Sequence, residues 1–131
     1  HSLLEKTEKK TEFSYPWINL EQCAAEENVM LLPGSLFRKI ADEVYAKAEA
    51  EPNIVYQISG TRTGLACVAY NHGVMITLDH MIFNNVFAEQ ILPLSIGEKP
   101  MYTDLDLVYM KDTVLTKEIE TLKNIMTEAI Q

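Results

Sequence analysis

Two turns in this sequence combine glycine, hydroxyl side chains and an arginine directly after an apolar run. The first turn, residues 33–38, follows an apolar run at 29–32, and the second, residues 59–62, follows a run at 54–58. Each turn holds one of the only two arginines in the chain. If each turn opens a helix, the first amides of that helix carry unpaired N–H donors and partial positive charge. Such a group of donors is suited to a small anionic or polar ligand.

Composition restricts the class of protein and its partners. The chain has 131 residues, of which 47% are apolar and 23% charged, as expected for one globular domain or part of a two-lobed one. A net charge of −8 argues against direct binding to a nucleic-acid backbone. The sequence contains no apolar run long enough to cross a membrane, and its first residues lack the apolar core of a signal peptide. Because the chain begins with histidine, we expect it to be a fragment or a processed form.

The other polar groups favour structural roles over chemistry. Cys23 and Cys67 lie among apolar neighbours without a basic cluster, which predicts free buried thiols in a reducing compartment. The three histidines do not share the spacing of a metal site, so no metal is expected. Asp104 and Asp106 fall on one face of a predicted strand, where a solvated edge is the expected role. No nucleophile or acid–base pair stands out, so we predict that the chain is not an enzyme and uses no cofactor.

Three short apolar segments predict the strands that position the two turns. The segments at 29–32, 54–58 and 73–78 are typical of strands buried on both faces. Helical patterns separate them, which implies a parallel sheet with right-handed connections. In such sheets ligands bind beyond the carboxyl ends of the strands, and both turns and Thr77 lie at those ends.

Helix signals separate and follow these strands. Ser35 is expected to cap a helix with one apolar face. Thr61 begins a second helix, which Gly73 is expected to close as a left-handed C-terminal cap. Asp79 is expected to cap a third helix, over residues 80–87.

Residues 91–131 follow a different pattern. A short extended segment at 91–94 precedes an alternating stretch at 102–110, which predicts a strand. Thr116 is then expected to cap a final helix with Leu122 on its apolar face.

In this order, the motifs resemble the effector-binding domain of LysR-type transcriptional regulators. The sequence Met-Leu-Leu-Pro-Gly-Ser at 30–35 resembles the first strand and turn of the second lobe. The segment at 69–78 resembles the run that contains the third strand of this lobe, although Asp79 stands where the family has proline. The segments at 92–94 and 105–112 resemble the return to the first lobe.

The resemblance implies an α/β fold: a Rossmann-like parallel-sheet lobe of a type II periplasmic-binding-protein-like fold, with a C-terminal strand and helix from the other lobe. Residues 1–12 would be a connector, 13–91 the effector-binding lobe two, and 92–131 the C-terminal return segment to lobe one. The helix-turn-helix domain, the linker helix and the first half of lobe one would precede His1. The strand at 102–110 would then lack its usual neighbours. We therefore expect it to pair with another chain or with lobe two, or to be partly exposed.

The function implied by the resemblance is ligand sensing by a transcription regulator. A small anionic or polar effector would bind in the cleft between the lobes and favour one inter-lobe angle. The full protein would be a cytoplasmic homo-oligomer, a dimer, with no membrane contact and with DNA bound only through the absent N-terminal domain. Two alternatives remain at this stage: a fragment of a solute-binding protein of a transport system, and an enzyme on the same bilobed scaffold. The residues upstream of this chain would separate them.

The resemblance also places the effector contacts at the strand-end turns. Ser35 is expected either to cap its helix alone or to cap it and touch the ligand. Gly60 would allow the ligand to approach the backbone. Arg62, together with Thr61 as a cap, is expected to bind a carboxylate, sulfate or phosphate, whereas Arg38 is expected to have a structural or surface role. The candidate effector-binding residues are Ser35, Ser59, Gly60, Thr61, Arg62 and Thr77.

Overall fold

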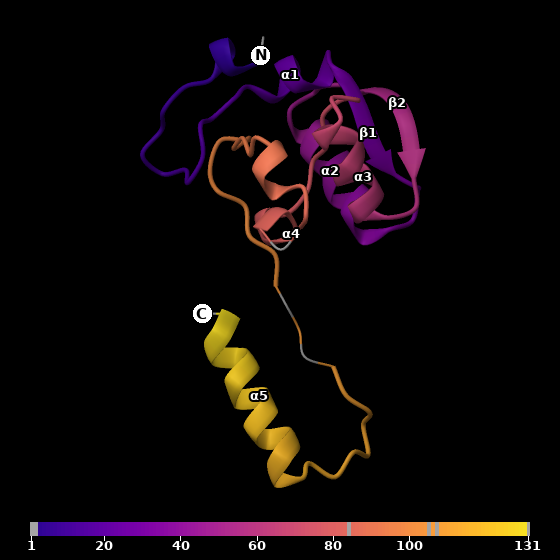
Figure 1. The fold of residues 1–131 in the computed structure, drawn as a ribbon, viewed down its shortest axis with the longest axis vertical. Coiled ribbons are helices and arrows are strands. Elements are labelled where there is room, and N and C mark those ends of the chain that lie inside the picture. Colours follow the sequence, from indigo (N-terminus) through magenta and orange to yellow (C-terminus); the bar gives the residue numbers. More distant parts are fainter. Residues whose placement is uncertain (1–2, 84, 105, 107, 131) are drawn as a thin grey trace. The chain divides into compact units, whose positions relative to one another are not determined.

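The computed structural model of the chain describes residues 3–83, 85–104, 106 and 108–130. The chain divides into two compact units, His1–Met101 and Tyr102–Gln131 (Figure 1). The first unit contains the sheet and the helices that surround it, and the second contains a single long helix. The candidate site residues of the sequence all fall in the first unit.

A small parallel sheet lies at the centre of the first unit. It pairs β1 (Glu27–Leu31) with β2 (Asn53–Ile58), and the register has one irregularity, after Asn28. Four of the five residues of β1 are buried. The first predicted strand is therefore confirmed, beginning two residues earlier than the apolar run suggested.

The second strand does not have the predicted burial. Its first five residues are exposed, and Tyr56 retains 47% of its accessible surface. The reason is its place at the edge of the sheet, since β1 is its only neighbour in the sheet that the structure describes. A sequence typical of an interior strand therefore forms an edge strand in this chain.

The third predicted strand, at 73–78, is reduced to one residue pair. Val74 forms a single parallel bridge with Asn28 on the side of β1 away from β2. Its N–H group donates to the Glu27 carbonyl (2.8 Å), and its own carbonyl accepts from Val29 (2.9 Å). Residues 75–77 then line an apolar cavity, and the described structure assigns no strand over 75–78. β1 therefore lies between β2 on one side and Val74 on the other.

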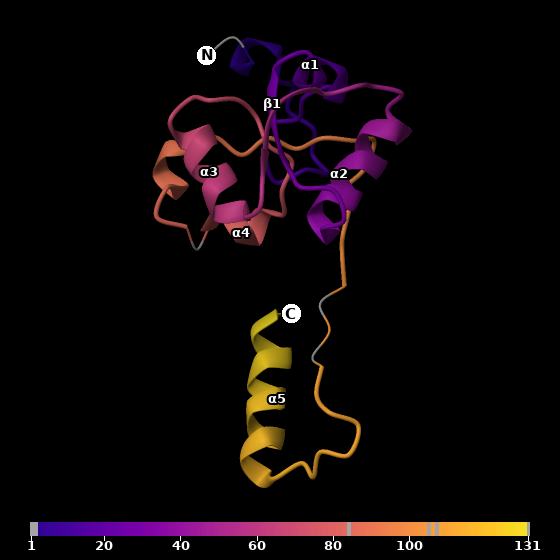
Figure 2. The same ribbon diagram turned by 90° about the vertical axis from the view of Figure 1, so that its right-hand side faces the viewer.

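Two helices cover opposite faces of this sheet (Figure 2). They are α2 (Leu36–Lys47), which follows β1, and α3 (Thr61–Ala69), which follows β2. The predicted cap of α2 is confirmed, because the Ser35 side chain accepts a hydrogen bond from the Arg38 N–H group (3.2 Å). The alternation of strand and helix over this part of the chain is thus confirmed.

The ends of α3 differ in detail from the prediction. Its N-cap position is Gly60, and Thr61 is the first helical residue and not the cap. At its C-terminal end the left-handed residue is Asn71 (φ 62°) and not Gly73, because asparagine also tolerates this conformation. Gly73 has a different role: its φ of +124° and its close approach to the Glu27 carbonyl leave no room for a Cβ atom.

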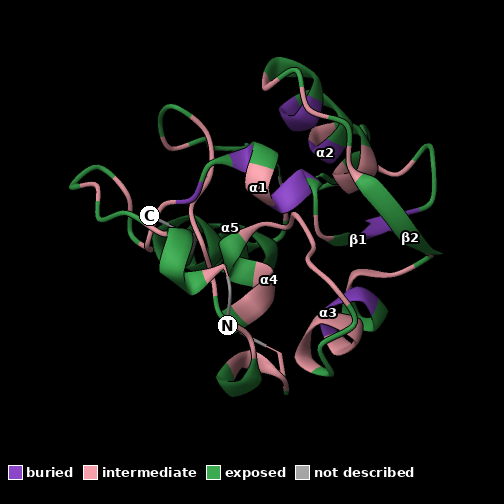
Figure 3. Cartoon of the chain, turned by 90° about the horizontal axis from the view of Figure 1, so that it is seen from above, coloured by how far each residue is buried: buried purple, intermediate pink, exposed green. Residues whose placement is uncertain are grey.

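The main core of the first unit lies between β1, α2 and the short helix α1 (Leu20–Ala24) (Figure 3). It encloses one buried polar side chain, Asn28, which is 1% exposed. The amide nitrogen of Asn28 donates to the carbonyls of Cys23 (3.0 Å) and Glu26 (2.8 Å), while its oxygen accepts from the Tyr45 hydroxyl. Burial raises the pKa of Cys23 to about 11 and raises that of Tyr45 further above its ordinary value. Cys23 is therefore a buried, protonated thiol, as predicted. Cys67 is also a free thiol but is only partly buried, so the prediction of burial is wrong for it.

The remaining short helices of the first unit are η1 (Leu4–Lys6), α4 (Asp79–Phe83) and η2 (Ala88–Gln90). The third predicted helix, over 80–87, is thus too long. Its pattern is interrupted where the Asn85 side chain accepts a hydrogen bond from the Phe87 N–H group (2.9 Å), which favours a turn over a continued helix.

The second unit confirms the final helix but not the strand before it. Helix α5 (Lys117–Ile130) begins after Thr116, whose hydroxyl accepts from the Ile119 N–H group (3.5 Å). The described residues of the stretch 102–110 form no strand and are exposed, because they have no strand to pair with in this unit. Leu105 and Leu107, which the prediction included, lie outside the described residues. The expectation that this stretch would be partly exposed is confirmed for the others.

Candidate functional site

The carboxyl ends of β1 and β2 lie side by side, so the two predicted turns meet at one edge of the sheet. Leu31 is opposite Ile58, and the Leu32 N–H group extends the pairing by donating to the Ile58 carbonyl (2.8 Å). Ser35 follows the end of β1, and Gly60 follows the end of β2. The N-termini of α2 and α3 therefore lie at the same edge, one on each face.

At the α2 turn, the hydroxyl group of Ser35 is already used. Its oxygen accepts from the Arg38 N–H group, and its hydrogen is donated to the Leu32 carbonyl (3.2 Å). A ligand at this turn would meet a hydroxyl with one lone pair left. The cap is thus shown, while a contact with ligand stays a prediction.

The guanidinium group of Arg38 is also engaged. It donates from Nε to Asp42 (2.9 Å), and from Nη1 to the Leu31 carbonyl (2.9 Å) and to Gln57 (3.2 Å). Its side chain is only 13% exposed. Arg38 therefore ties α2 to the ends of both strands, which is the structural role expected of it.

The α3 turn, by contrast, is largely exposed. Among the described residues, no side chain caps α3, whose N-cap is Gly60. Ser59 and Arg62 are exposed, and Thr61 is half-buried. A Cβ atom added to Gly60 would meet nothing within 4 Å, so the space beside its backbone is open. The first amides of α3 and the exposed guanidinium group of Arg62 are thus together at an open surface.

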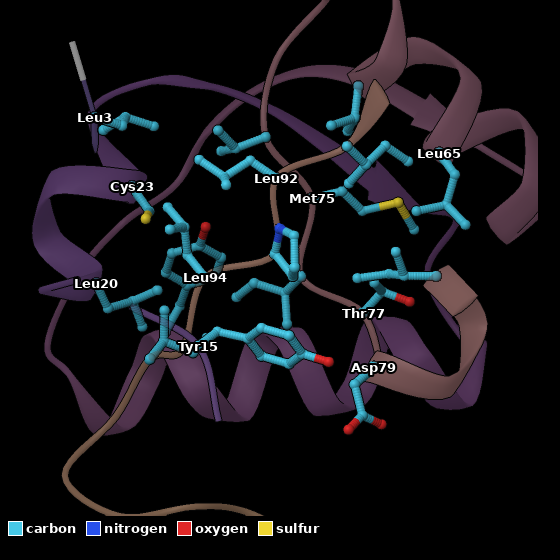
Figure 4. A pocket seen from close by; sticks show the side chains of 18 residues that line it. Leu3, Tyr15, Leu20, Cys23, Leu65, Met75, Thr77, Asp79, Leu92 and Leu94 are labelled. Carbon is cyan, nitrogen blue, oxygen red and sulfur yellow. The ribbon is translucent and has the colours of Figure 1, made fainter. Parts of the chain in front are cut away.

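The sixth candidate, Thr77, lies elsewhere. It lines a cavity of about 170 Å³ within the first unit, and it alone of the six candidates does so (Figure 4). Its hydroxyl oxygen is buried and has no hydrogen-bond partner in the described part of the structure. The structure therefore brings five candidates to the strand-end edge and separates the sixth from them. The walls of the cavity come from many short segments, and no sequence motif would have grouped them.

Neither metal binding nor membrane insertion is indicated by the described residues. In that part of the chain, no group of three or more metal-ligating side chains is placed to hold an ion. Its helices include none that is long and apolar enough to cross a membrane.

A parallel α/β unit with helix N-termini gathered at the carboxyl ends of its strands defines a class of small-ligand-binding domains. Over residues 14–131 the chain matches the family model described as LysR substrate binding domain, and it belongs to that family. This confirms the resemblance carried by the ordered motifs, and with it a place in transcription regulation and a periplasmic-binding-protein-like fold. Searches of curated proteins and of solved structures gave no match.

Proposed function

We propose that this chain is the effector-sensing part of a LysR-type regulator and that it binds a small anion at the strand-end edge. The observation that carries the proposal is the contrast between the two turns. The α2 turn is capped by Ser35, and its arginine is bonded to three partners, whereas the α3 turn is uncapped and its arginine is exposed. Of the two turns, it is the α3 turn that lacks a side-chain cap among the described residues and presents an exposed arginine to a ligand.

The electrostatics of the α3 turn support an anion. The N-terminus of a helix carries partial positive charge, so a cation in the first turn is unfavourable by a few tenths of a kcal/mol. Arg62 adds a full positive charge at this position, in a chain whose net charge is −8. An anion bound there would relieve the repulsion and accept hydrogen bonds from both sources. In this proposal Ser59, Gly60, Thr61 and Arg62 supply the main contacts, with Ser35 as a secondary one. Thr77 lines the cavity instead and is not a contact of this site.

The proposal extends to the organisation of the whole protein. Residues 13–91 would form lobe two, 92–131 the return to lobe one, and 1–12 a connector. Lobe one would supply the other half of the effector site, so the present chain alone should bind weakly. Effector binding would favour one inter-lobe angle in a cytoplasmic dimer whose DNA contacts come from a helix-turn-helix domain. The domain would act by binding alone, without catalysis.

A thermal-shift screen of small carboxylates, sulfonates and phosphates would identify the anion, and calorimetry would then measure its affinity. Arg62→Ala should weaken binding by about tenfold, as expected for the loss of one charge-assisted hydrogen bond. Lys39→Ala is the matched control, because Lys39 is an exposed cation in the first turns of α2. Equal affinities for the wild type and Arg62→Ala would contradict the proposal.

A further inference from the structure

The cavity in the first unit is lined mainly by apolar side chains. Leu65 of α3 lies on one side of it, Leu20 and Cys23 of α1 on another, and Leu92 and Leu94 between them (Figure 4). Val68 of α3 also lines the cavity. Its volume is about 170 Å³. An engineered cavity of similar size and lining in another protein stays dry and binds benzene. Size and lining therefore suit a molecule of about one aromatic ring.

Three oxygen-bearing side chains interrupt this apolar lining at one end. They are Thr77, Asp79 and Tyr15, and Figure 4 shows the Tyr15 hydroxyl on the side where Asp79 lies. Tyr45 also lines the cavity, but its hydroxyl is already bonded to Asn28. The Asp79 side chain belongs to an exposed residue, so this end of the cavity is its mouth. Partial burial and the nearby charge of Asp79 both raise the pKa of Tyr15, which keeps its hydroxyl protonated.

The Thr77 hydroxyl is the unusual member of this group. Its oxygen is buried without a hydrogen-bond partner in the part of the chain that the structure describes. A buried polar atom without a partner is costly, and such atoms are rare in folded proteins. A ligand that supplies a hydrogen-bond donor at this point would remove the cost.

We propose that this cavity is a second binding site, separate from the strand-end edge, for a neutral molecule of one aromatic ring with one hydrogen-bond donor. The ring occupies the apolar part between α1 and α3, and the donor reaches the Thr77 oxygen. The Asp79 carboxylate at the mouth disfavours anions, so a phenol or an aromatic alcohol fits better than an aromatic acid. This chemistry is the reverse of that at the α3 turn, which favours an anion.

The test uses phenol as the probe, toluene as the matched ligand without a hydroxyl, and benzoate as the anion. Binding to the 131-residue chain is followed by amide chemical shifts in NMR titrations. Phenol is expected to bind saturably with a Kd on the order of 1 mM, as is usual for so small a ligand. The shifts should centre on Leu65, Val68 and Met75, and benzoate should bind much more weakly.

Two variants make the assignment specific. Thr77→Val keeps the shape of the side chain and removes the hydroxyl. It should therefore weaken phenol binding about threefold to tenfold and leave the affinity for toluene unchanged. Thr63→Val, an exposed threonine of α3, is the matched control and should change neither. Val68→Phe fills the cavity and should weaken both ligands.

Other outcomes would overturn the inference. It fails if neither phenol nor toluene saturates at about ten times the expected Kd, or if Thr77→Val affects both ligands equally. It also fails if phenol shifts residues 59–62, because the probe would then occupy the strand-end edge. The proposed anion site has its own test in Arg62→Ala, which should leave phenol binding unchanged, so the two proposals can fail separately.

Discussion

The hydrogen bond between Tyr45 and Asn28 offers the sharpest test of how the first unit is held together. Tyr45 lies on α2 and is 2% exposed, and Asn28 lies on β1. The asparagine amide also bonds to the last carbonyls of α1, so one side chain links three elements. Tyr45→Phe removes only the hydroxyl and leaves the ring packing intact.

The expected loss follows from the burial of the partner. Without the hydroxyl, the Asn28 oxygen is buried and has no other hydrogen bond among those the structure describes. An unsatisfied buried acceptor costs about 1–3 kcal/mol. We expect Tyr45→Phe to lower the free energy of unfolding by about 1–2 kcal/mol, and Asn28→Ala by more, because it also strips donors from the α1 carbonyls.

Urea denaturation followed by circular dichroism measures these losses, with Tyr70→Phe as the control. Tyr70 is 67% exposed, so removal of its hydroxyl should change stability by less than about 0.5 kcal/mol. The double variant, Tyr45→Phe with Asn28→Ala, should lose less than the sum of the two single losses. Strict additivity, or a neutral Tyr45→Phe, would show that packing alone joins α2 to β1 and would refute the reasoning.

Alkaline pH provides a second readout of the same bond. The pKa of Tyr45 is raised above its ordinary value of 10.0, chiefly by burial. Its contribution to stability is therefore complete below pH 10 and declines as pH rises above 10, because the unfolded state then loses the proton more readily. Tyr45→Phe should flatten this part of the pH dependence.

Three further predictions follow from single residues. Gly73→Ala should destabilise the chain by about 3 kcal/mol or more in urea denaturation, because its φ of +124° and the Glu27 carbonyl both exclude a Cβ atom; a loss below 1 kcal/mol would contradict this geometry. Gly60→Ala should leave stability nearly unchanged, since its φ is −140° and the space is open, yet weaken any anion found at the α3 turn. Burial raises the pKa of Cys23 from 9.0 to about 11, so its contribution to stability is complete below pH 9 and about 2–3 kcal/mol is lost as pH rises to 11. Cys23→Ala should remove that loss, and Cys67→Ala should not. Urea denaturation curves at pH 8 and pH 10.5 would measure the difference.

Local signals in the sequence were sufficient for several elements. The Ser35 cap and the Thr116 cap depend on residues within three positions of each other, and both are confirmed. The parallel pairing of β1 and β2 also follows from the order of elements along the chain, because two adjacent strands joined by a helix usually run in the same direction. Features of this kind depend on residues that are close in sequence, so they can be predicted without knowledge of the tertiary structure.

The errors arose where the structure depends on distant neighbours. The run at 54–58 has the apolar character of an interior strand, but its exposure is set by which strands lie beside it. The apolar run at 73–78 and the alternating stretch at 102–110 are likewise typical of strands, and both lack a continuous partner in the described structure. Sequence pattern predicts the ability to form a strand, whereas pairing decides whether one forms.

In the candidate site, too, local sequence predicted the position of the turns, while contacts with distant residues set their properties. The two turns are alike in sequence, and both lie at the edge where parallel strands end. Their difference comes from bonds across the fold, chiefly those that Arg38 makes to the end of β1 and to Gln57 of β2. The family resemblance assigned Arg38 a structural role, and the structure supplies the bonds that explain it. The cavity with Thr77 had no counterpart in sequence, since its walls are assembled from separate segments.

The unequal burial of the two helices explains why their first turns differ. Helix α2 is fixed to the core by Ala41, Val44 and Tyr45, and its N-terminus is fixed to the strands by Ser35 and Arg38. Helix α3 buries only Gly64 and Leu65, and no described side chain closes its first turn. In the described structure the N-terminus of α2 is held by the Ser35 cap and by Arg38, whereas the first turn of α3 has no side-chain cap and an exposed arginine. If the α3 turn is the effector site, its openness in the free chain is the expected state.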